Sequence, residues 1–168
     1  RRGHRVTGVD RTRPYLQEAR ERAAEEGLDV EFVESDMRSF RRPDSFDVAL
    51  SLFTSFGYFK EAEENMAALR NVYGSLRDGG VLLIEMMGTE VLARIYQPRD
   101  WSEVDGVYWL QERKVADDWS WQDGRWILVS GEMVHEFKFG HWIYSAVELQ
   151  QMLREAGFAQ VDVYGDMA

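Results

Sequence analysis

The 168-residue sequence contains no cysteine. Disulfide bonds, metal sites with thiolate ligands and cysteine nucleophiles are therefore all excluded. It also lacks any run of 18 apolar residues, the length needed for a membrane-spanning helix, and residues 1–10 lack the apolar core of a signal peptide. These absences predict a soluble protein of the cytoplasm, with no metal site and no membrane partner.

Basic side chains are the minority. Twenty Lys and Arg stand against 30 Asp and Glu, giving a formal charge of −10 and a pI near 4.8. Such a surface repels phosphate backbones, so nucleic acid is not expected as a partner. With 45% hydrophobic and 13% aromatic residues, the chain can build the core of one domain of ordinary size, which argues against disorder.

Strand and helix patterns alternate through the N-terminal part of the chain. Apolar runs predict strands, and apolar residues at helical spacing predict the helices between them. The strands are expected at residues 6–9, 30–33, 46–52 and 81–87, and the helices from Thr12 and over 61–76. Parallel strands need such crossovers, so we expect an α/β fold with a Rossmann-like, doubly wound, mostly parallel sheet.

The composition changes after residue 87. All six tryptophans fall between Trp101 and Trp142. Strands are predicted at 107–115 and 126–139, and Asp123-Gly124 is typical of a tight hairpin turn. We therefore expect residues 88–144 to form an antiparallel β insertion, called the flap here, between a core of residues 1–87 and a C-terminal unit of residues 145–168.

The C-terminal unit has its own helix signals. Ser145 and Glu148 stand at the spacing of a capping box, and Gly157 is placed to end the helix. Residues 158–164 are predicted to return to the sheet as a strand. Residues 5–10 already resemble a buried strand, and residues 161–168 resemble a strand without a partner. We therefore expect the chain to be a piece of a longer protein.

Two carboxylates follow consecutive predicted strands. Asp10 follows the first and Asp36 the second, and ligands of open α/β sheets bind at the carboxyl ends of strands. One carboxylate there can accept hydrogen bonds from ribose hydroxyls, and the other from the exocyclic amine of adenine. Either could also be a helix cap or a turn former. As a pair, they favour a nucleotide site.

Four stretches carry a resemblance to a known family: Gly8-Val9-Asp10, ESDMR at 34–38, FDVA at 46–49 and LRDGGVL at 76–82. In this order and spacing they resemble the class I S-adenosylmethionine-dependent methyltransferases. SDMRSF at 35–40 and LFTSFGYF at 52–59 resemble the small-molecule branch, which includes sugar N-methyltransferases. The family's glycine-rich loop, which would precede residue 1, is absent from the sequence.

The resemblance implies S-adenosylmethionine as the cofactor. It implies that Asp10 holds the ribose and that Arg11 flanks the adenine. Asp36 would then bind the adenine amine, and Met37 would pack against the ring. The partner implied is a small-molecule acceptor.

The methyl-transfer end is expected beyond the third strand. The resemblance implies that backbone groups of Leu52 and Phe53 face the sulfonium. Because the cofactor is already activated, the protein mainly aligns the acceptor and excludes water. Phe56, Tyr58 and Trp142 are expected to line the acceptor pocket, where aromatic faces could also hold a cation.

A hydroxyl or protonated amine acceptor would also need a general base. The candidates are His135, His141, Tyr144 and Glu85, each of which could instead be a packing or surface residue. The predicted function is methyl transfer to a nucleophilic nitrogen or oxygen of a small molecule.

Two alternatives stay open. The first is a non-catalytic binding or assembly domain that recruits a partner through its aromatic flap, and the flap could equally form a homodimer. The second is a nicotinamide-dependent oxidoreductase, with Asp10 on the ribose of NAD. The stretches at 35–37 and 78–80 disfavour the oxidoreductase, because that class does not need them.

Overall fold

The computed structural model describes residues 3–165. Within this range the chain forms eight strands and four helices, in an order that begins with alternating strands and helices and continues with a run of strands. They are β1 (Val6–Asp10), α1 (Arg13–Glu25), β2 (Val30–Glu34), β3 (Phe46–Ser51), α2 (Ala62–Tyr73), β4 (Leu76–Ile84), α3 (Thr89–Ile95), β5 (Arg99–Val104), β6 (Val107–Val115), β7 (Trp121–Ser130), β8 (Met133–Trp142) and α4 (Ala146–Ala156).

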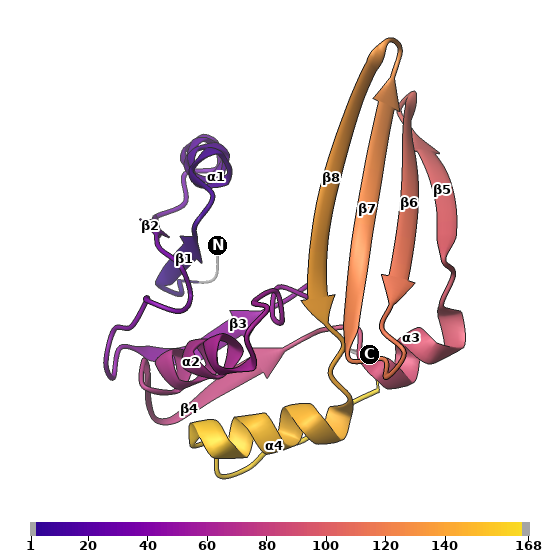
Figure 1. Cartoon of the computed structure of the whole chain (residues 1–168). Helices are drawn as coiled ribbons and strands as arrows, with labels where there is room; N and C mark the ends of the chain where they lie inside the picture. The colour runs from indigo at the N-terminus through magenta and orange to yellow at the C-terminus, as the bar shows by residue number, and fades with distance from the viewer. Residues whose placement is uncertain (1–2, 166–168) are drawn as a thin grey trace.

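The core contains two parallel strand pairs. Strand β1 pairs with β2, and β3 with β4, each pair being connected by a helical crossover. Among residues 3–165, β1 does not pair with β3, so the two sheets stand apart in Figure 1. The expected α/β fold with parallel strands and an antiparallel insertion is confirmed.

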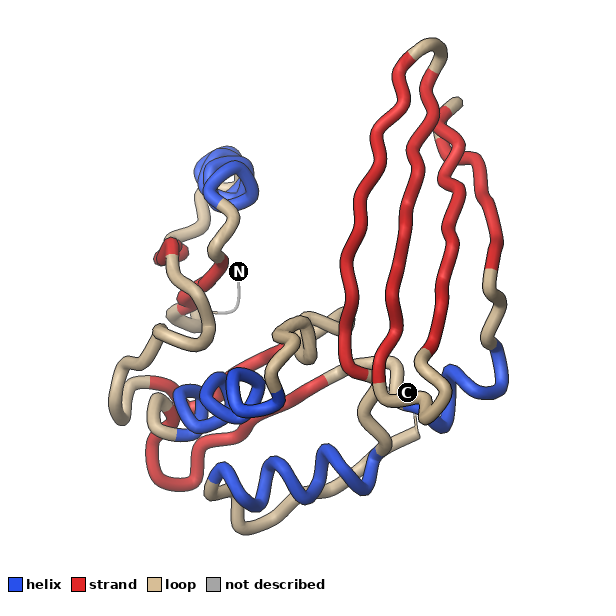
Figure 2. The backbone as a smooth tube through the Cα atoms, viewed as in Figure 1, coloured by secondary structure: helices blue, strands red, loops and turns tan. Residues whose placement is uncertain are grey.

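The flap is a four-stranded antiparallel sheet in the order β5-β6-β7-β8. Its long strands rise away from the core, as Figures 1 and 2 show. The prediction of a hairpin turn at Asp123-Gly124 is wrong, because both residues lie within β7 and pair with β8. A Cβ at Gly124 would lie 2.6 Å from the ring of Phe139, so this glycine permits close packing instead of a turn.

The actual hairpin turns lie elsewhere. Asp105 and Gly106 connect β5 to β6, with φ values of 50° and 76°. Gly131, at φ 58°, lies in the turn between β7 and β8. These left-handed conformations match the twist of the strands that they join. Neither the short helix α3 nor the strand β5 was predicted from the sequence.

Two other boundaries differ from prediction. The helix expected over 61–76 ends at Tyr73, and Leu76 already begins β4. Residues 158–164 form no strand; instead the carbonyl of Val161 accepts a hydrogen bond from Gln150, and Phe158 packs edge-on against Tyr73. Side-chain packing thus replaces strand pairing in this segment. The end of the strand predicted at 161–168 lies outside the described residues.

The hydrophobic core lies where α2, α4 and the base of the flap meet. Phe56, Leu69 and Tyr144 are buried there with Leu153 of α4, and partly buried residues of β4 pack against them. Helix α4 begins with the predicted capping box: the Ser145 side chain accepts from the Glu148 backbone, and the Glu148 side chain accepts from the Ser145 backbone. Because residues of α2, α4 and β4 share this core, the two helices cover one face of the β3–β4 pair.

The opposite face of that pair is apolar and exposed. Val48 and Leu50 of β3 are 56% and 62% exposed, and they pair with Val81 and Leu83 of β4, which are exposed as well. Strand β3 also has no strand neighbour on its second edge among the described residues. An open edge with an apolar face favours pairing with another chain.

We therefore expect the 168-residue chain to self-associate through β3. Replacing Val48 by Lys should weaken this association about ten-fold, because one valine would no longer be buried. Sedimentation velocity over a concentration series measures the change. Val147→Lys, at a still more exposed apolar position on α4, is the control. A chain that stays monomeric at high concentration would contradict the expectation.

Candidate functional site

The carboxyl ends of β1 and β2 lie side by side. Asp10 is the last residue of β1 and pairs with Glu34 at the end of β2. The carbonyl of Asp10 accepts a hydrogen bond from the Ser35 backbone at 3.0 Å. Asp36, the next residue, is therefore held close to Asp10. Both predicted nucleotide-binding carboxylates lie at one edge of the β1–β2 sheet.

Asp10 has a local structural role. Its Oδ1 accepts a hydrogen bond from the backbone N–H of Thr12 at 2.6 Å, which turns the chain into α1. Thr12 itself is the N-cap residue, without a side-chain cap bond. A carboxylate offers about four acceptor positions. The turn therefore uses only part of the capacity of Asp10.

Asp36 is held by Arg38. Its Oδ1 accepts from the Arg38 backbone at 2.8 Å and from Nε at 3.0 Å, and its Oδ2 accepts from Nη2 at 2.8 Å. The Arg38 guanidinium lowers the pKa of Asp36 below its usual value, and the charge of Arg11 contributes in the same direction. Met37, between them, is about a third exposed. The Asp36 carboxylate is thus ionised and fixed in orientation.

The loop after β3 has an unusual backbone. Phe53 and Thr54 both have φ near 54°, a conformation that non-glycine residues rarely adopt. Glu85 holds it: its side chain accepts from the Phe53 backbone, and its carbonyl accepts from Thr54. The Leu52 carbonyl accepts from the Ser55 hydroxyl, while the Phe53 side chain is 84% exposed. Such strain is common at functional sites.

The two aromatic residues that follow lie in different surroundings. Phe56 is only 3% exposed and packs in the core against Tyr144. Tyr58 is 43% exposed and contacts the flap, with ring centroids 5.6 Å from His141 and 6.5 Å from Phe139. Tyr58 therefore lies where the loop after β3 meets the flap.

One face of the flap continues this aromatic surface. Phe139 packs edge-on against Trp126 at 5.1 Å, and Trp126 packs edge-on against Trp109 at 6.1 Å. Alternate residues of a strand share a face, and the pairing of β6, β7 and β8 aligns these rings. We call Tyr58, Phe139, Trp126 and Trp109 the aromatic stripe.

His141 is buried, and both of its ring nitrogens have hydrogen-bond partners. Its Nδ1 lies 3.1 Å from the carbonyl of Trp142, which can only accept, so Nδ1 carries the proton. Its Nε2 then accepts from the Gln122 amide, also at 3.1 Å. Burial lowers the pKa of His141 and keeps the ring neutral.

His135 lies far from His141. It pairs with Leu128 near the turn between β7 and β8, whereas His141 pairs with Gln122 at the other end of β8. Six residues of strand separate the two histidines by about 20 Å. The structure therefore does not bring His135 together with the other predicted site residues.

Tyr144 is 8% exposed, and its hydroxyl finds no hydrogen-bond partner among the described residues. Burial raises the pKa of Tyr144, and the charge of Glu148 adds to the effect. Its ring stacks on Trp142, with centroids 6.1 Å apart. The phenol thus stays protonated, which suits a hydrogen-bond donor better than a base.

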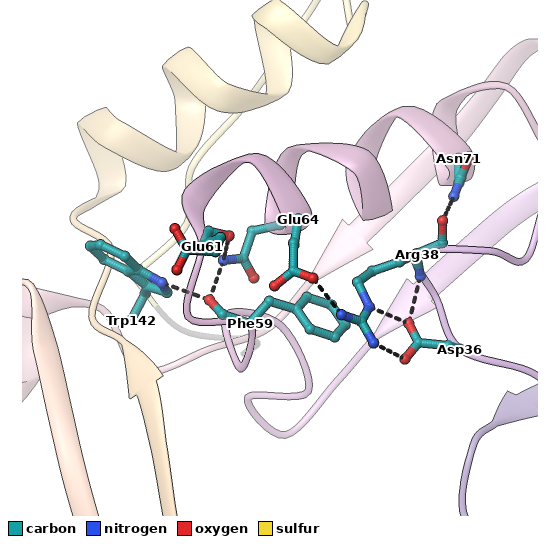
Figure 3. Close-up of polar contacts among 8 residues, drawn as sticks. Asp36, Arg38, Phe59, Glu61, Glu64, Asn71 and Trp142 are labelled. Carbon is teal, nitrogen blue, oxygen red and sulfur yellow. Dashed lines mark hydrogen bonds and ion pairs between the residues drawn. The ribbon is translucent and has the colours of Figure 1, made fainter.

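Trp142 joins the flap to the core, as Figure 3 shows. Its Nε1–H donates to the carbonyl of Phe59 at 2.8 Å, and Asn65 of α2 donates to the same oxygen at 2.8 Å. The ring of Phe59 lies 4.4 Å from the Arg38 guanidinium. Neither Phe59 nor Arg38 was predicted from the sequence as a site residue, although both lie in the stretches that carried the resemblance.

The predicted residues thus fall into two groups. Asp10, Arg11, Asp36 and Met37 lie at the ends of β1 and β2, and most of the others lie where the loop after β3 meets the base of the flap. Within residues 3–165, no cluster of three or more His, Asp or Glu side chains is arranged to hold a metal. The same residues contain no helix long and apolar enough to cross a membrane.

Substitutions of Trp142 and Tyr144 should affect the stability of the protein differently. Trp142→Phe removes the donor to Phe59 and some ring volume, so it should lower the free energy of unfolding by about 1–2 kcal/mol. Tyr144→Phe removes a buried hydroxyl without a partner and should change it by less than about 0.5 kcal/mol. Urea unfolding followed by circular dichroism compares the two. Equal losses would show that the hydroxyl of Tyr144 has a partner.

The N-terminal part of this chain is similar to a known protein family. Residues 1–80 match the family described as the methyltransferase domain. A dTDP-3-amino-3,4,6-trideoxy-alpha-D-glucopyranose N,N-dimethyltransferase from Streptomyces venezuelae is 35% identical over 80 residues, covering 48% of this chain and 32% of that protein.

Two solved structures share the fold. The CcbJ methyltransferase from Streptomyces caelestis has a TM-score of 0.78 at 21% identity, over 92% of this chain and 64% of that one. S-adenosylmethionine-bound CalS10, an amino pentose methyltransferase from Micromonospora echinaspora, has a TM-score of 0.62 at 22% identity, over 91% of this chain and 65% of that one. This chain therefore spans less than two thirds of the length of all three proteins.

The match over residues 1–80 covers the ends of β1 and β2, with Asp10 and Asp36. The shared fold extends over the flap and α4 as well. The resemblance drawn from four short stretches is thereby confirmed. Residues 1–80 are thus similar to a methyltransferase domain, and the chain shares the fold of solved methyltransferases over most of its length.

Proposed function

We propose that the full-length protein transfers a methyl group from S-adenosylmethionine to a nitrogen or oxygen nucleophile of a small molecule. The observation that carries this proposal is the pair of carboxylates, Asp10 and Asp36, at neighbouring strand ends of a methyltransferase fold. In the same proposal, residues 1–87 and 145–168 form the core, and residues 88–144 form a flap that covers the acceptor.

The residues at this edge fit the adenosine half of the cofactor. Ribose hydroxyls and the adenine amine are donors, and Asp10 and Asp36 supply acceptors of the matching kind. Asp36 keeps its charge beside Arg38, and Met37 offers an exposed apolar side chain for the ring. Arg11 would flank the adenine from the end of β1.

When bound, S-adenosylmethionine supplies a methyl group on a positively charged sulfur. Backbone groups at Leu52 and Phe53 would face that sulfur, in the loop that Glu85 holds in its left-handed conformation. A fixed loop aligns the reacting groups without further ordering on binding, which is the main contribution that this chemistry asks of the protein.

The aromatic stripe favours an aminated acceptor. Faces of tyrosine and tryptophan attract cations, and they exclude water from the site. Two relatives are named as methyltransferases of amino sugars, which agrees with a nitrogen nucleophile. Tyr58 would touch the acceptor, whereas Phe56 and Trp142 would support the wall from behind.

A neutral amine needs no base, because its lone pair is already available. If the acceptor is a hydroxyl, His141, Tyr144 and His135 remain the proposed bases, with different merits. His141 would first have to release Gln122 from Nε2, and Tyr144 holds its proton tightly. His135 would need an acceptor that reaches the far end of the flap.

The ribose contact is tested by Asp10→Ala in the full-length protein. Loss of a charged acceptor should weaken S-adenosylhomocysteine binding by about 1.5–3 kcal/mol, or ten- to over one hundred-fold. Isothermal titration calorimetry measures the dissociation constant. Asp47→Ala is the matched control and should bind normally, because Asp47 lies near the amino end of β3, away from the site, and pairs with Arg77.

An unchanged dissociation constant in Asp10→Ala would remove Asp10 from the site. If the folded wild-type protein bound no S-adenosylhomocysteine at all, the methyltransferase proposal would fail. The alternative of a binding or assembly domain that recruits its partner through the flap would then take its place.

The second face of the flap is the one that we expect to bind a second copy of the same chain. Trp101 is 67% exposed there, beside a shallow apolar groove that it forms with Tyr108, Leu110 and Val129. This face turns away from the aromatic stripe, because its residues alternate with those of the stripe along β6 and β7. A homodimer through it would leave the acceptor side open.

The two faces therefore make separable predictions. In the full-length protein, Trp101→Ser should abolish the dimer formed through this face, with turnover kept within about two-fold, because large apolar side chains dominate such interfaces. Tyr58→Ala should keep the dimer and raise the KM for amino-sugar acceptors by about ten-fold. Light scattering and acceptor kinetics on both variants provide the measurements. Loss of turnover in Trp101→Ser would move the acceptor site to this face.

A further inference from the structure

Arg38 makes more contacts than a residue in a simple surface ion pair. It follows β2 in sequence, yet its guanidinium binds Asp36, Glu64 of α2 and the ring of Phe59 (Figure 3). The side chain is 37% exposed, and all three contacts come from different segments. Arg38 is therefore held from several sides.

The contacts to Asp36 leave a defined acceptor position. The two oxygens of a carboxylate accept about four hydrogen bonds. Oδ1 already receives two, from the backbone and Nε of Arg38, whereas the bond from Nη2 is one of two that Oδ2 can accept. The planar fork of arginine fixes both oxygens at once, which a lysine cannot do. One direction at Oδ2 thus remains for a donor from a ligand.

Arg38 is itself braced from α2 and the flap. Glu64 binds its second terminal nitrogen, and Asn71 donates to its carbonyl at 2.7 Å. The Phe59 ring beneath it is fixed because the carbonyl of Phe59 accepts from Trp142 and Asn65. The orientation of the Asp36 carboxylate therefore depends on contacts with α2 and, through Phe59, with the base of the flap.

We propose that Arg38 is the positioning residue of the cofactor site: it orients the Asp36 carboxylate so that Oδ2 receives the exocyclic amine of adenine. This inference rests on the proposed function and adds the source of its selectivity for adenine. Arg38 does not touch the cofactor; it acts through Asp36. The charged groups around Asp36 are Arg38 itself, Arg11 after β1 and, behind Arg38, Glu64.

The role of Arg38 has a consequence that simple structural support would not have. An oriented carboxylate favours a ligand with the 6-amino group and repels one with a 6-oxo group in its place. Loss of structural support would weaken both ligands alike. The ratio of the two affinities therefore reports the orientation of Asp36, independently of how much protein is folded.

The test compares S-adenosylhomocysteine with S-inosylhomocysteine, its 6-oxo analogue, by calorimetry on the full-length protein. The wild type should prefer the adenosyl ligand by at least about ten-fold, the usual value of a charge-assisted hydrogen bond. Arg38→Met keeps the apolar stem and removes the donors. It should bind the adenosyl ligand about ten-fold more weakly and the inosyl ligand unchanged, so that the preference is lost.

Two further experiments distinguish positioning of Asp36 from general structural support. Glu64→Gln removes the negative charge on the far side of the guanidinium but keeps an oxygen that can accept from it, so Arg38 stays in place and the preference should stay within about two-fold. In a double-mutant cycle, Asp36→Asn combined with Arg38→Met should bind no more weakly than Asp36→Asn alone, because Arg38 acts only through that carboxylate.

The outcomes are distinct. If Arg38→Met weakens both ligands equally, or if the two substitutions in the cycle are additive, Arg38 is a structural support and the inference is overturned. It is also overturned if the wild type binds both ligands alike, because Asp36 would then not receive the amine. A wild type that binds neither ligand would instead overturn the proposed function, and the inference with it.

Discussion

The carbonyl oxygen of Phe59 accepts hydrogen bonds from Trp142 and Asn65, each at 2.8 Å. Trp142 ends the last strand of the flap, Asn65 is fully buried in α2, and Phe59 lies in the connection between β3 and α2. A buried carbonyl without partners would cost about 1–3 kcal/mol. Three separate segments are thereby fixed at one atom, and the flap is fixed relative to the core.

The same residue connects this junction to the nucleotide edge. The Phe59 ring lies under Arg38, whose guanidinium holds the Asp36 carboxylate. Strands β1 and β2 do not pair with β3 and β4 in the described part of the chain, so side-chain contacts must join the two sheets. Arg38 with Glu64, and Asn71 with the carbonyls of Met37 and Arg38, are among those contacts.

Much of the fold could be predicted because its signals are local. The capping box at Ser145, the apolar strand before Ser51 and the β6 strand all lie where the sequence places them. The prediction of a turn at Asp123-Gly124 was wrong. An Asp-Gly pair is typical of hairpin turns, but here Gly124 lies within a strand, under the ring of Phe139. Only the pairing of β7 with β8 distinguishes the two uses of glycine.

The sequence by itself determined the alternation of strands and helices, the resemblance to methyltransferases, and the two carboxylates at the ends of β1 and β2, because each depends on residues close together in the chain. Tertiary structure alone decided the environment of each side chain. It separated His135 from His141, buried Phe56, and joined Phe59 to Trp142 across 83 residues. Spacing carries no information on such contacts, since they depend on how the flap and α2 pack together.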